Sequence, residues 1–323
     1  MDRASVISLL GQDWVSLQEL IKETMRSGVK LLNTTNDSIL EHSGKQLRPM
    51  MSLLMAHACS GGANHDSLCF AAAAEILHNA TLIHDDIADC SAERRGIPTV
   101  VSMLGPSAAV LLGDFWLARA VEVVMNAERS QKAIRHFAKT LTDLSEGEML
   151  QMEKASSADT SEEDYFRIIY CKTASLFEAA AMTGAVSVDA SDEMMEVARQ
   201  YACMCGIAFQ IRDDILDYAG DEALGKPVGI DLQEQKITLP LLGALKGHPD
   251  GQKIRSMVKD IHEHPEYCDQ VRDFVRDNGG VQYAEDVLED YIERAVRVLD
   301  ILPQSAARDA LKEIVRYNSV RNR

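Results

Sequence analysis

Residues 66–89 read DSLCFAAAAEILHNATLIHDDIAD, and this stretch indicates the architecture of the whole chain. Its apolar side chains recur at three- and four-residue intervals, which is the spacing of a buried helix face. It ends in the acidic pattern Asp85-Asp86-Ile87-Ala88-Asp89. The stretch therefore predicts a long, buried helix that carries three carboxylates at its carboxyl end.

A second stretch repeats the acidic pattern later in the chain. Asp213-Asp214-Ile215-Leu216-Asp217 has the same order of acidic and apolar residues, again near the end of a long apolar helix. On a helix, residues i and i+4 share a face, so the first and last aspartates of each motif point together. Clustered carboxylates need a neutralising partner, and Mg²⁺ prefers oxygen ligands. Two copies favour paired Mg²⁺ sites over the alternative, a solvated acidic helix face.

Helical spacing continues through most of the chain, and strict alternation of apolar and polar residues is nearly absent. We expect an all-α fold with one domain over residues 1–323 and a single large bundle of about 12 to 13 helices. The expected helices span 5–25, 29–41, 46–59, 66–89, 107–127, 130–154, 161–183, 191–219, 236–245, 250–261, 266–278, 281–301 and 304–317.

Composition excludes several classes of partner. Lys plus Arg number 33 and Asp plus Glu number 50, which gives a net charge of −17. So negative a chain is not expected to bind nucleic acid or to dock electrostatically on anionic lipid. The seven cysteines include no C-x-x-C pair and indicate free thiols in a reducing cytosol. The amino-terminal residues do not form a signal peptide, so we expect a cytoplasmic protein.

Basic residues lie near both acidic motifs in the sequence. Arginine side chains and helix amino termini suit phosphate oxygens. Any one of these residues alone is explained as a surface ion pair, whereas their combination predicts two phosphorylated substrates. The basic candidates are Lys45, Arg48, Arg94, Arg95, Lys172, Lys226 and Lys236.

In this order, the motifs resemble those of the trans-isoprenyl diphosphate synthase (polyprenyl synthetase) family. The resemblance spans nearly the whole chain and implies an isoprenoid synthase-like bundle around a deep central cavity. The matching segments are Gly44-Lys45-x-x-Arg48-Pro49, His78-Asn79-Ala80-Thr81-Leu82-Ile83-His84-Asp85-Asp86-x-x-Asp89, Arg94-Arg95-Gly96-x-Pro98-Thr99, Gly113-Asp114, Lys172-Thr173-Ala174, Phe209-Gln210-x-x-Asp213-Asp214-x-x-Asp217 and Gly225-Lys226-x-x-Gly229-x-Asp231-Leu232-x-Glu234-x-Lys236-x-Thr238-Leu239-Pro240.

The resemblance implies a Mg²⁺-dependent, head-to-tail condensation of isopentenyl diphosphate with an allylic diphosphate, farnesyl or geranylgeranyl. About three Mg²⁺ ions bind the two aspartate motifs, the allylic diphosphate ionises, and isopentenyl diphosphate attacks the cation. The chemistry needs no protein nucleophile, in keeping with the lack of a Ser-His-Asp or Cys-His signature.

By position, the resemblance assigns residues to three groups. The metal residues are Asp85, Asp86, Asp89, Asp213, Asp214 and Asp217, with Asp85, Asp89 and Asp213 as expected ligands. Isopentenyl diphosphate is assigned to Lys45, Arg48, His78 and Arg95, and the allylic diphosphate to Arg94, Lys172, Thr173, Gln210, Lys226 and Lys236. One departure is Lys45-Gln46 where the family commonly has Lys-Arg, and there we expect at most weaker phosphate affinity. An ordinary buried histidine is the alternative for His78.

Small side chains before the first motif predict a long product. In the family the growing chain first meets the residues five and four before the first aspartate, here Ala80 and Thr81, followed by Leu77. Phe, Tyr and Trp are absent between Ala71 and Ile87. We expect products of about 30 to 50 carbons, with octaprenyl as the central estimate, in a deep cavity. A shorter farnesyl or geranylgeranyl product is the alternative, with a floor supplied by another helix.

Other readings of the motifs remain open at this point. A class I terpene cyclase usually has one D-D-x-x-D motif and no isopentenyl diphosphate pocket. A second alternative is a catalytically inactive partner subunit, but such subunits lack some of the motif aspartates. A third is a purely structural helical protein, which needs no phosphate-binding motifs. The family is usually homodimeric, and the apolar 113–125 helix is a candidate interface, although a catalytic half of a heterodimer has the same motifs. We also expect transient membrane contact when an apolar product is released.

Overall fold

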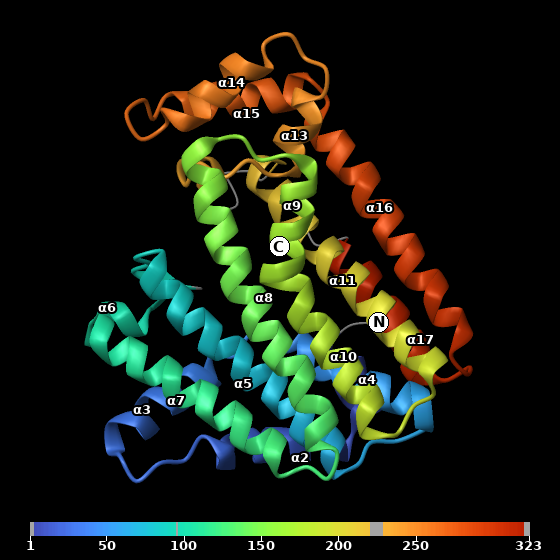
Figure 1. The fold of residues 1–323 in the computed structure, drawn as a ribbon. Helices are drawn as coiled ribbons and strands as arrows, with labels where there is room; N and C mark the ends of the chain where they lie inside the picture. Colours follow the sequence, from blue (N-terminus) through green and yellow to red (C-terminus); the bar gives the residue numbers. More distant parts are fainter. Residues whose placement is uncertain (1–2, 95, 220–228, 320–323) are drawn as a thin grey trace. The chain divides into compact units, whose positions relative to one another are not determined.

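The computed structural model describes residues 3–94, 96–219 and 229–319, with side chains to residue 316. The all-α prediction is confirmed: within these ranges the only strands are β1 (Glu93–Arg94) and β2 (Ile97–Pro98), which pair antiparallel, with Glu93 opposite Pro98. Figure 1 shows the helices in chain order. Their bounds are α1 Arg3–Leu10, α2 Gln12–Thr24, α3 Lys30–Glu41, α4 Leu47–Ser60, α5 His65–Ala88, α6 Val100–Leu104, α7 Pro106–Met125, α8 Ser130–Ser157, α9 Glu162–Ile169, η1 Tyr170–Ala174, α10 Ser175–Ser187, α11 Asp192–Ala219, α12 Ile230–Gln233, α13 Leu239–Leu245, α14 Gly251–Lys259, α15 Tyr267–Asp277, α16 Gly280–Val298, η3 Leu299–Ile301 and α17 Ala306–Ser319.

The chain forms two compact units that do not follow chain order. Unit 1 contains residues 1–138, 179–199 and 301–311, and unit 2 contains residues 139–178, 200–300 and 312–323. The boundaries fall inside α8, α10, α11, η3 and α17. The single-domain assignment and the deep central cavity stay predictions. None of the described helices is long and apolar enough to cross a bilayer.

Helix α5 is the core of unit 1. Its amino end is fixed by a capping box, in which the Asn64 side chain accepts a hydrogen bond from the backbone N–H of Ser67. The four residues Ala71–Ala74 are completely buried, and α5 packs against α2, α4 and α7 (Figure 1). The helix pair α5–α7 approaches closely at Gly113, where a Cβ atom would lie 2.2 Å from His84 Nε2. Small residues therefore let α7 pack tightly against the helix that carries the first acidic motif.

In unit 2 the helices α13, α14, α15 and α16 pack on one another, and the most extensive contact joins α13 to α16. Helix α13 contacts both α15 and α16, and α14 lies beside α15 (Figure 1). Gly280 allows a backbone approach, because a Cβ there would lie 2.1 Å from the carbonyl oxygen of Pro240. This packing holds residues 229–245, which follow the second acidic motif, against the rest of the unit.

Some predicted helices differ from the structure. The 5–25 helix is two helices, since Gly11 has a φ of 50° and separates α1 from α2. The 161–183 helix contains a π-helical turn, η1, and the 281–301 helix ends in a 3₁₀ turn. Two short helices, α6 and α12, were not predicted because each is shorter than two turns of the periodic pattern.

Candidate active site

The first acidic motif lies at the carboxyl end of α5, and its three carboxylates have different surroundings. Asp85 is half-buried and Asp89 is exposed, whereas Asp86 is buried with 6% of its surface exposed. Asp86 faces Arg94 of β1, whose Nε donates a hydrogen bond to Oδ1 at 2.7 Å. A helix carboxyl end disfavours negative charge, so the remaining carboxylates require cations nearby.

The residues assigned to isopentenyl diphosphate lie on two elements of unit 1. Lys45 and Arg48 flank the first residue of α4, and His78 is half-buried on α5. Gln46, at the position where the family commonly has Arg, has a φ of 54° and is buried, and its amide donates to Gln18 Oε1 at 3.3 Å. The substitution therefore places a neutral amide inside the unit. Arg95 lies outside the described residues.

The residues assigned to chain length lie on the same helix as the first motif. Ala80 and Leu77 are buried, with 0% and 2% of their surfaces exposed. Thr81 is half-buried, and its hydroxyl donates to the carbonyl oxygen of His78 at 2.8 Å. The threonine hydroxyl is thus hydrogen-bonded within its own helix, and the methyl group is the apolar part of this small side chain.

The second acidic motif, at the end of α11 in unit 2, again has three unlike members. Asp213 is exposed, and Asp214 is buried and accepts hydrogen bonds from Tyr165 Oη at 2.7 Å and Gln210 Nε2 at 2.9 Å. Burial raises the pKa of Asp214 well above its ordinary value. Asp217 caps α12, because its carboxylate accepts from the backbone N–H groups of Ile230 and Asp231, both at 3.1 Å. Burial raises the pKa of Asp217 despite these bonds.

Lys172 and Thr173 lie on the π-helical turn η1, between two helices that carry glycine at the point of approach. A Cβ at Gly147 of α8 would lie 2.6 Å from Cys171 Cβ, and one at Gly206 of α11 would lie 2.5 Å from Ala174 Cα. The Thr173 hydroxyl donates to Gln210 Oε1 at 2.8 Å. Such single π-helical turns occur often at functional sites.

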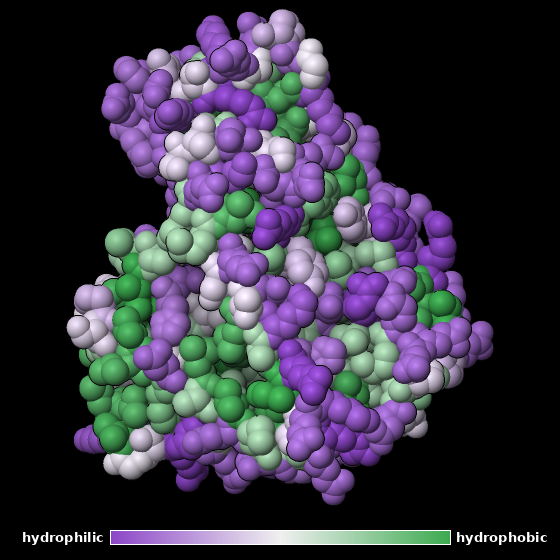
Figure 2. Space-filling model, in the orientation of Figure 1, coloured by the Kyte–Doolittle hydropathy of each residue, from purple (hydrophilic) through white to green (hydrophobic). Residues whose placement is uncertain are grey.

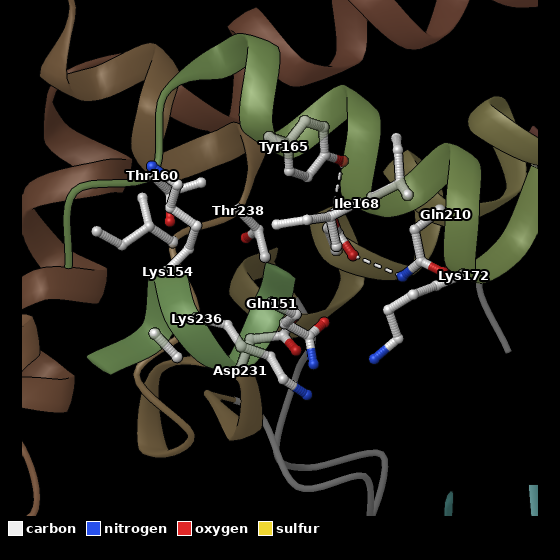
Figure 3. Close-up of a pocket in the computed structure, with 14 residues that line it drawn as sticks. Gln151, Lys154, Thr160, Tyr165, Ile168, Lys172, Gln210, Asp231, Lys236 and Thr238 are labelled. Atoms are coloured by element: carbon white, nitrogen blue, oxygen red, sulfur yellow. Dashed lines mark hydrogen bonds between the residues drawn. The ribbon is translucent and has the colours of Figure 1, made fainter. Parts of the chain in front are cut away.

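Of the residues assigned to the allylic diphosphate and the second motif, Lys172, Gln210, Asp214 and Lys236 line one cavity of about 190 Å³ within unit 2 (Figure 3). Lys172 pairs with Glu148, and Lys236 pairs with Glu234. Asp231 also lines the cavity, and burial followed by the Asp217 charge raises the pKa of Asp231 to about 6. The cavity wall thus combines lysines, an amide and carboxyls, a donor set suited to an anion held together with a cation. Lys226 lies outside the described residues.

Sequence reasoning missed three residues of this cavity region: Tyr165, Glu148 and Asp231. Asp231 lies inside a quoted motif but received no role there. Glu148 follows Gly147 within a helical pattern, and an isolated glycine in such a pattern often has a packing reason. Tyr165 gives no sequence signal, since its role depends on a partner far along the chain.

The donor set fits Mg²⁺. Within the described ranges, no group of three or more His, Cys, Asp or Glu side chains is arranged to hold a metal ion. Mg²⁺ does not require such a cage, because it is usually held by one or two carboxylates and completes its shell with water and substrate phosphates. Asp85 with Asp89, and Asp213, offer carboxylates of this kind on surfaces that are not fully buried.

Comparison with known proteins places the chain in one family. The family model described as polyprenyl synthetase matches residues 29–275. The chain is 36% identical to an all-trans-nonaprenyl-diphosphate synthase (geranyl-diphosphate specific) of Rhodobacter capsulatus, over 97% of this chain and 96% of that protein. It is also 36% identical to the octaprenyl diphosphate synthase of Escherichia coli, over 96% of each.

A solved structure agrees with the sequence comparisons. The polyprenyl synthase of Caulobacter crescentus, solved in complex with calcium and isoprenyl diphosphate, is similar with a TM-score of 0.90 and 33% identity, over 100% of this chain and 98% of that one. The match to the family model extends over most of the chain, and these relatives are similar along nearly their full length. The chain therefore belongs to the polyprenyl synthetase family and is a trans-prenyl diphosphate synthase, a prenyltransferase.

Proposed function

We propose that this enzyme condenses isopentenyl diphosphate with farnesyl or geranylgeranyl diphosphate to make an all-trans polyprenyl diphosphate of about 30 to 50 carbons, with octaprenyl as the central estimate. The observation that carries the proposal is the set of small, fully buried side chains on α5 before Asp85, namely Ala71–Ala74 and Ala80. The similarity to nonaprenyl and octaprenyl diphosphate synthases supports it.

In the proposed mechanism, Asp85, Asp89 and Asp213 would hold the Mg²⁺ ions, about three in number, and the positive charge of these ions would stabilise the pyrophosphate leaving group. Lys172 and Lys236 bind the allylic diphosphate as point charges, exchanging their glutamate partners for phosphate oxygens. Arg94, fixed by Asp86, adds a planar guanidinium to the same anion. Thr173 and Gln210 orient the reacting end, and the apolar α5 residues exclude water from the growing chain.

Product analysis tests the proposal. Purified enzyme is incubated with Mg²⁺, labelled isopentenyl diphosphate and either allylic primer, and the dephosphorylated alcohols are sized by chromatography. The expected result is a series that ends at about 30 carbons or more. Ala80→Phe adds a large side chain five residues before Asp85, so its series is expected to end earlier. A wild-type series that ends at 15 or 20 carbons contradicts the long-chain assignment, and cyclic hydrocarbons indicate a terpene cyclase.

We also propose that the enzyme is a homodimer formed through α6 and α7. Figure 2 shows hydrophobic residues gathered over these two helices of unit 1. Leu111 has 69% of its surface exposed, which is unusual for a leucine on a lone surface helix. The other exposed apolar residues of this face are Met103, Leu104, Val110, Val121 and Met125.

Sedimentation velocity tests the interface. The wild-type chain is expected to sediment as a dimer, and Leu111→Arg is expected to shift it to monomer because a desolvated charge is costly. Leu9→Arg, on an exposed leucine of α1 outside this face, is the control and is expected to leave the dimer intact. A monomeric wild type, or a dimer unaffected by Leu111→Arg, contradicts the interface.

Finally, we propose that the enzyme works in the cytoplasm and contacts the membrane only to deliver its product. A chain of about 30 carbons or more partitions strongly into lipid, at roughly 0.8 kcal/mol for each buried CH₂. Co-sedimentation with neutral phospholipid vesicles is expected to be weak without substrates and to increase during turnover. Binding that is equally strong without substrates contradicts transient contact.

A further inference from the structure

The strongest feature outside the assigned residues is a buried tyrosine that ends a chain of hydrogen bonds in unit 2. Tyr165, on α9, has 2% of its surface exposed, and its phenol lies against Asp214 of the second acidic motif. Dashed lines in Figure 3 mark the hydrogen bonds that the Tyr165 phenol and the Gln210 amide make to this carboxyl. None of the roles given to the motif residues requires this tyrosine.

The hydrogen bonds connect three elements. Tyr165 Oη donates to Asp214 Oδ2 at 2.7 Å, Gln210 Nε2 donates to Asp214 Oδ1 at 2.9 Å, and Thr173 Oγ1 donates to Gln210 Oε1 at 2.8 Å. All three lengths are those of good hydrogen bonds. The chain therefore runs from α9 through α11 to the π-helical turn η1.

The hydrogen bonds converge on Asp214 from both sides: Tyr165 donates from α9, and Gln210, which itself accepts from Thr173, donates from α11. Both oxygens of that carboxyl accept a hydrogen bond, so its orientation is fixed from two sides. This fixes the amide of Gln210, since the opposite orientation would place its oxygen against the carboxyl oxygen. Gln210 Oε1 in turn takes the single hydroxyl hydrogen of Thr173, which leaves the Thr173 hydroxyl only lone pairs for any further partner.

We propose that Tyr165 is a positioning residue for prenyl transfer: it holds Asp214 so that Gln210 and Thr173 keep the orientation required at the reacting end of the allylic substrate. The inference rests on the proposed function. It also gives the aspartates of the second motif different roles, because Asp214 belongs to this chain of hydrogen bonds whereas the side chain of Asp213 is exposed. Tyr165 does not touch substrate in this proposal, and acts through Asp214.

Packing keeps the tyrosine in place independently of its hydroxyl. The Tyr165 ring makes an edge contact with Phe166, with centroids 5.3 Å apart, and the side chain lines the cavity beside Ile168. Tyr165→Phe therefore retains the ring and removes only the donor to Asp214. Tyr201→Phe is the matched control, since Tyr201 is a fully buried tyrosine of unit 2 on α11 that does not line the cavity.

Steady-state kinetics with both substrates give the first test. Tyr165→Phe is expected to lower kcat by about tenfold or more, because the reacting groups lose their fixed orientation, and to leave the KM for isopentenyl diphosphate within about twofold. Tyr201→Phe is expected to keep the wild-type kcat. An unchanged kcat in Tyr165→Phe, in an active wild-type background, overturns the proposal. An inactive wild type instead refutes the proposed function.

A double-variant comparison distinguishes positioning from general destabilisation. In Asp214→Asn one carboxyl oxygen becomes an NH₂ group, so one of the two hydrogen bonds to residue 214, from Tyr165 or from Gln210, must reverse its direction or break. Tyr165→Phe and Asp214→Asn break the same chain, so the double variant is expected to lose no more activity than the more damaged single variant. Multiplied losses overturn the proposal.

A structural readout completes the test without turnover. In a crystal structure of Tyr165→Phe, the Thr173–Gln210 hydrogen bond is expected to be lengthened beyond 3.5 Å or replaced. Calorimetry with an unreactive allylic diphosphate analogue is expected to show weaker binding of the analogue, with isopentenyl diphosphate affinity unchanged. An intact chain from Asp214 to Thr173 in the variant overturns the proposal.

Discussion

Gly206→Ala is a direct perturbation of the π-helical turn. A Cβ at residue 206 would lie 2.5 Å from Ala174 Cα, 2.8 Å from its Cβ and 3.3 Å from its backbone nitrogen. Because the nearest atom belongs to the backbone, no side-chain rotation relieves the contact. Helix α11 and the turn must separate by about 1 Å to reach ordinary van der Waals distance.

The magnitude follows from three terms. Overpacking of this kind costs about 1–3 kcal/mol. Separation by about 1 Å also breaks the 2.8 Å bond from Thr173 to Gln210, one helical turn beyond Gly206, for about 1 kcal/mol more. Alanine restores about 1 kcal/mol of helix propensity. The net loss in the free energy of unfolding is therefore about 1–3 kcal/mol.

Activity is expected to fall further than stability. A displacement of about 1 Å at the reacting groups costs roughly 100-fold in rate. Urea denaturation measures the first effect, and kcat with saturating substrates at a temperature where the variant stays folded measures the second. The control is Gly251→Ala, a helical glycine whose Cβ would meet only ordinary contacts at 3.7 Å and beyond. A Gly206→Ala enzyme with wild-type stability and kcat refutes the inference that η1 depends on its close approach to α11 at Gly206.

Three further predictions concern other contacts. The pKa of Asp231 is about 6 in the folded chain and 3.8 ordinarily, so the folded chain holds this proton more tightly than the unfolded chain does. The free energy of unfolding without metal is therefore expected to fall as the pH rises from about 4 to 6. Urea titrations of Asp231→Asn should show a smaller dependence on pH in this range. Asp86→Asn should lower the free energy of unfolding by about 1–2 kcal/mol in urea denaturation. This is less than the loss of a fully buried ion pair because the Arg94 side chain is 37% exposed. An unchanged free energy of unfolding would show that the pair does not stabilise the fold. Gly113→Ala should lower the free energy of unfolding by about 1 kcal/mol, the low end of the overpacking cost, because the atoms it meets belong to the His84 ring, which can turn away; unchanged thermal unfolding would contradict the close α5–α7 approach.

Helix periodicity predicts much of the fold because the buried faces here are long and apolar. The 66–89 prediction agrees with α5 to within one residue at each end, and 191–219 agrees equally well with α11. The π-helical turn had no such signal, since one extra residue in a turn leaves the apolar spacing of 161–183 nearly unchanged. Its position depends on Gly147 and Gly206, whose significance is visible only when the three elements are packed.

The candidate site was predictable in its residue types but not in its pairings. Spacing along one helix predicts which carboxylates share a face, as for Asp85 and Asp89. It gives no information on partners from other elements, such as Arg94 for Asp86 or Tyr165 for Asp214. Those pairings depend on long-range packing, which one sequence does not reveal.

The pairings explain why each motif begins with two aspartates. Adjacent residues on a helix point about 100° apart, so the two carboxylates of a pair cannot share a face. In both motifs the second member is buried and hydrogen-bonded inward, Asp86 to Arg94 and Asp214 to Tyr165 and Gln210. The first members, Asp85 and Asp213, are the more accessible. In the proposed mechanism each pair thus supplies one carboxylate for the cation and one that orders the neighbouring substrate-binding residue, so exchanging the two roles by mutation is expected to abolish kcat even when charge is preserved.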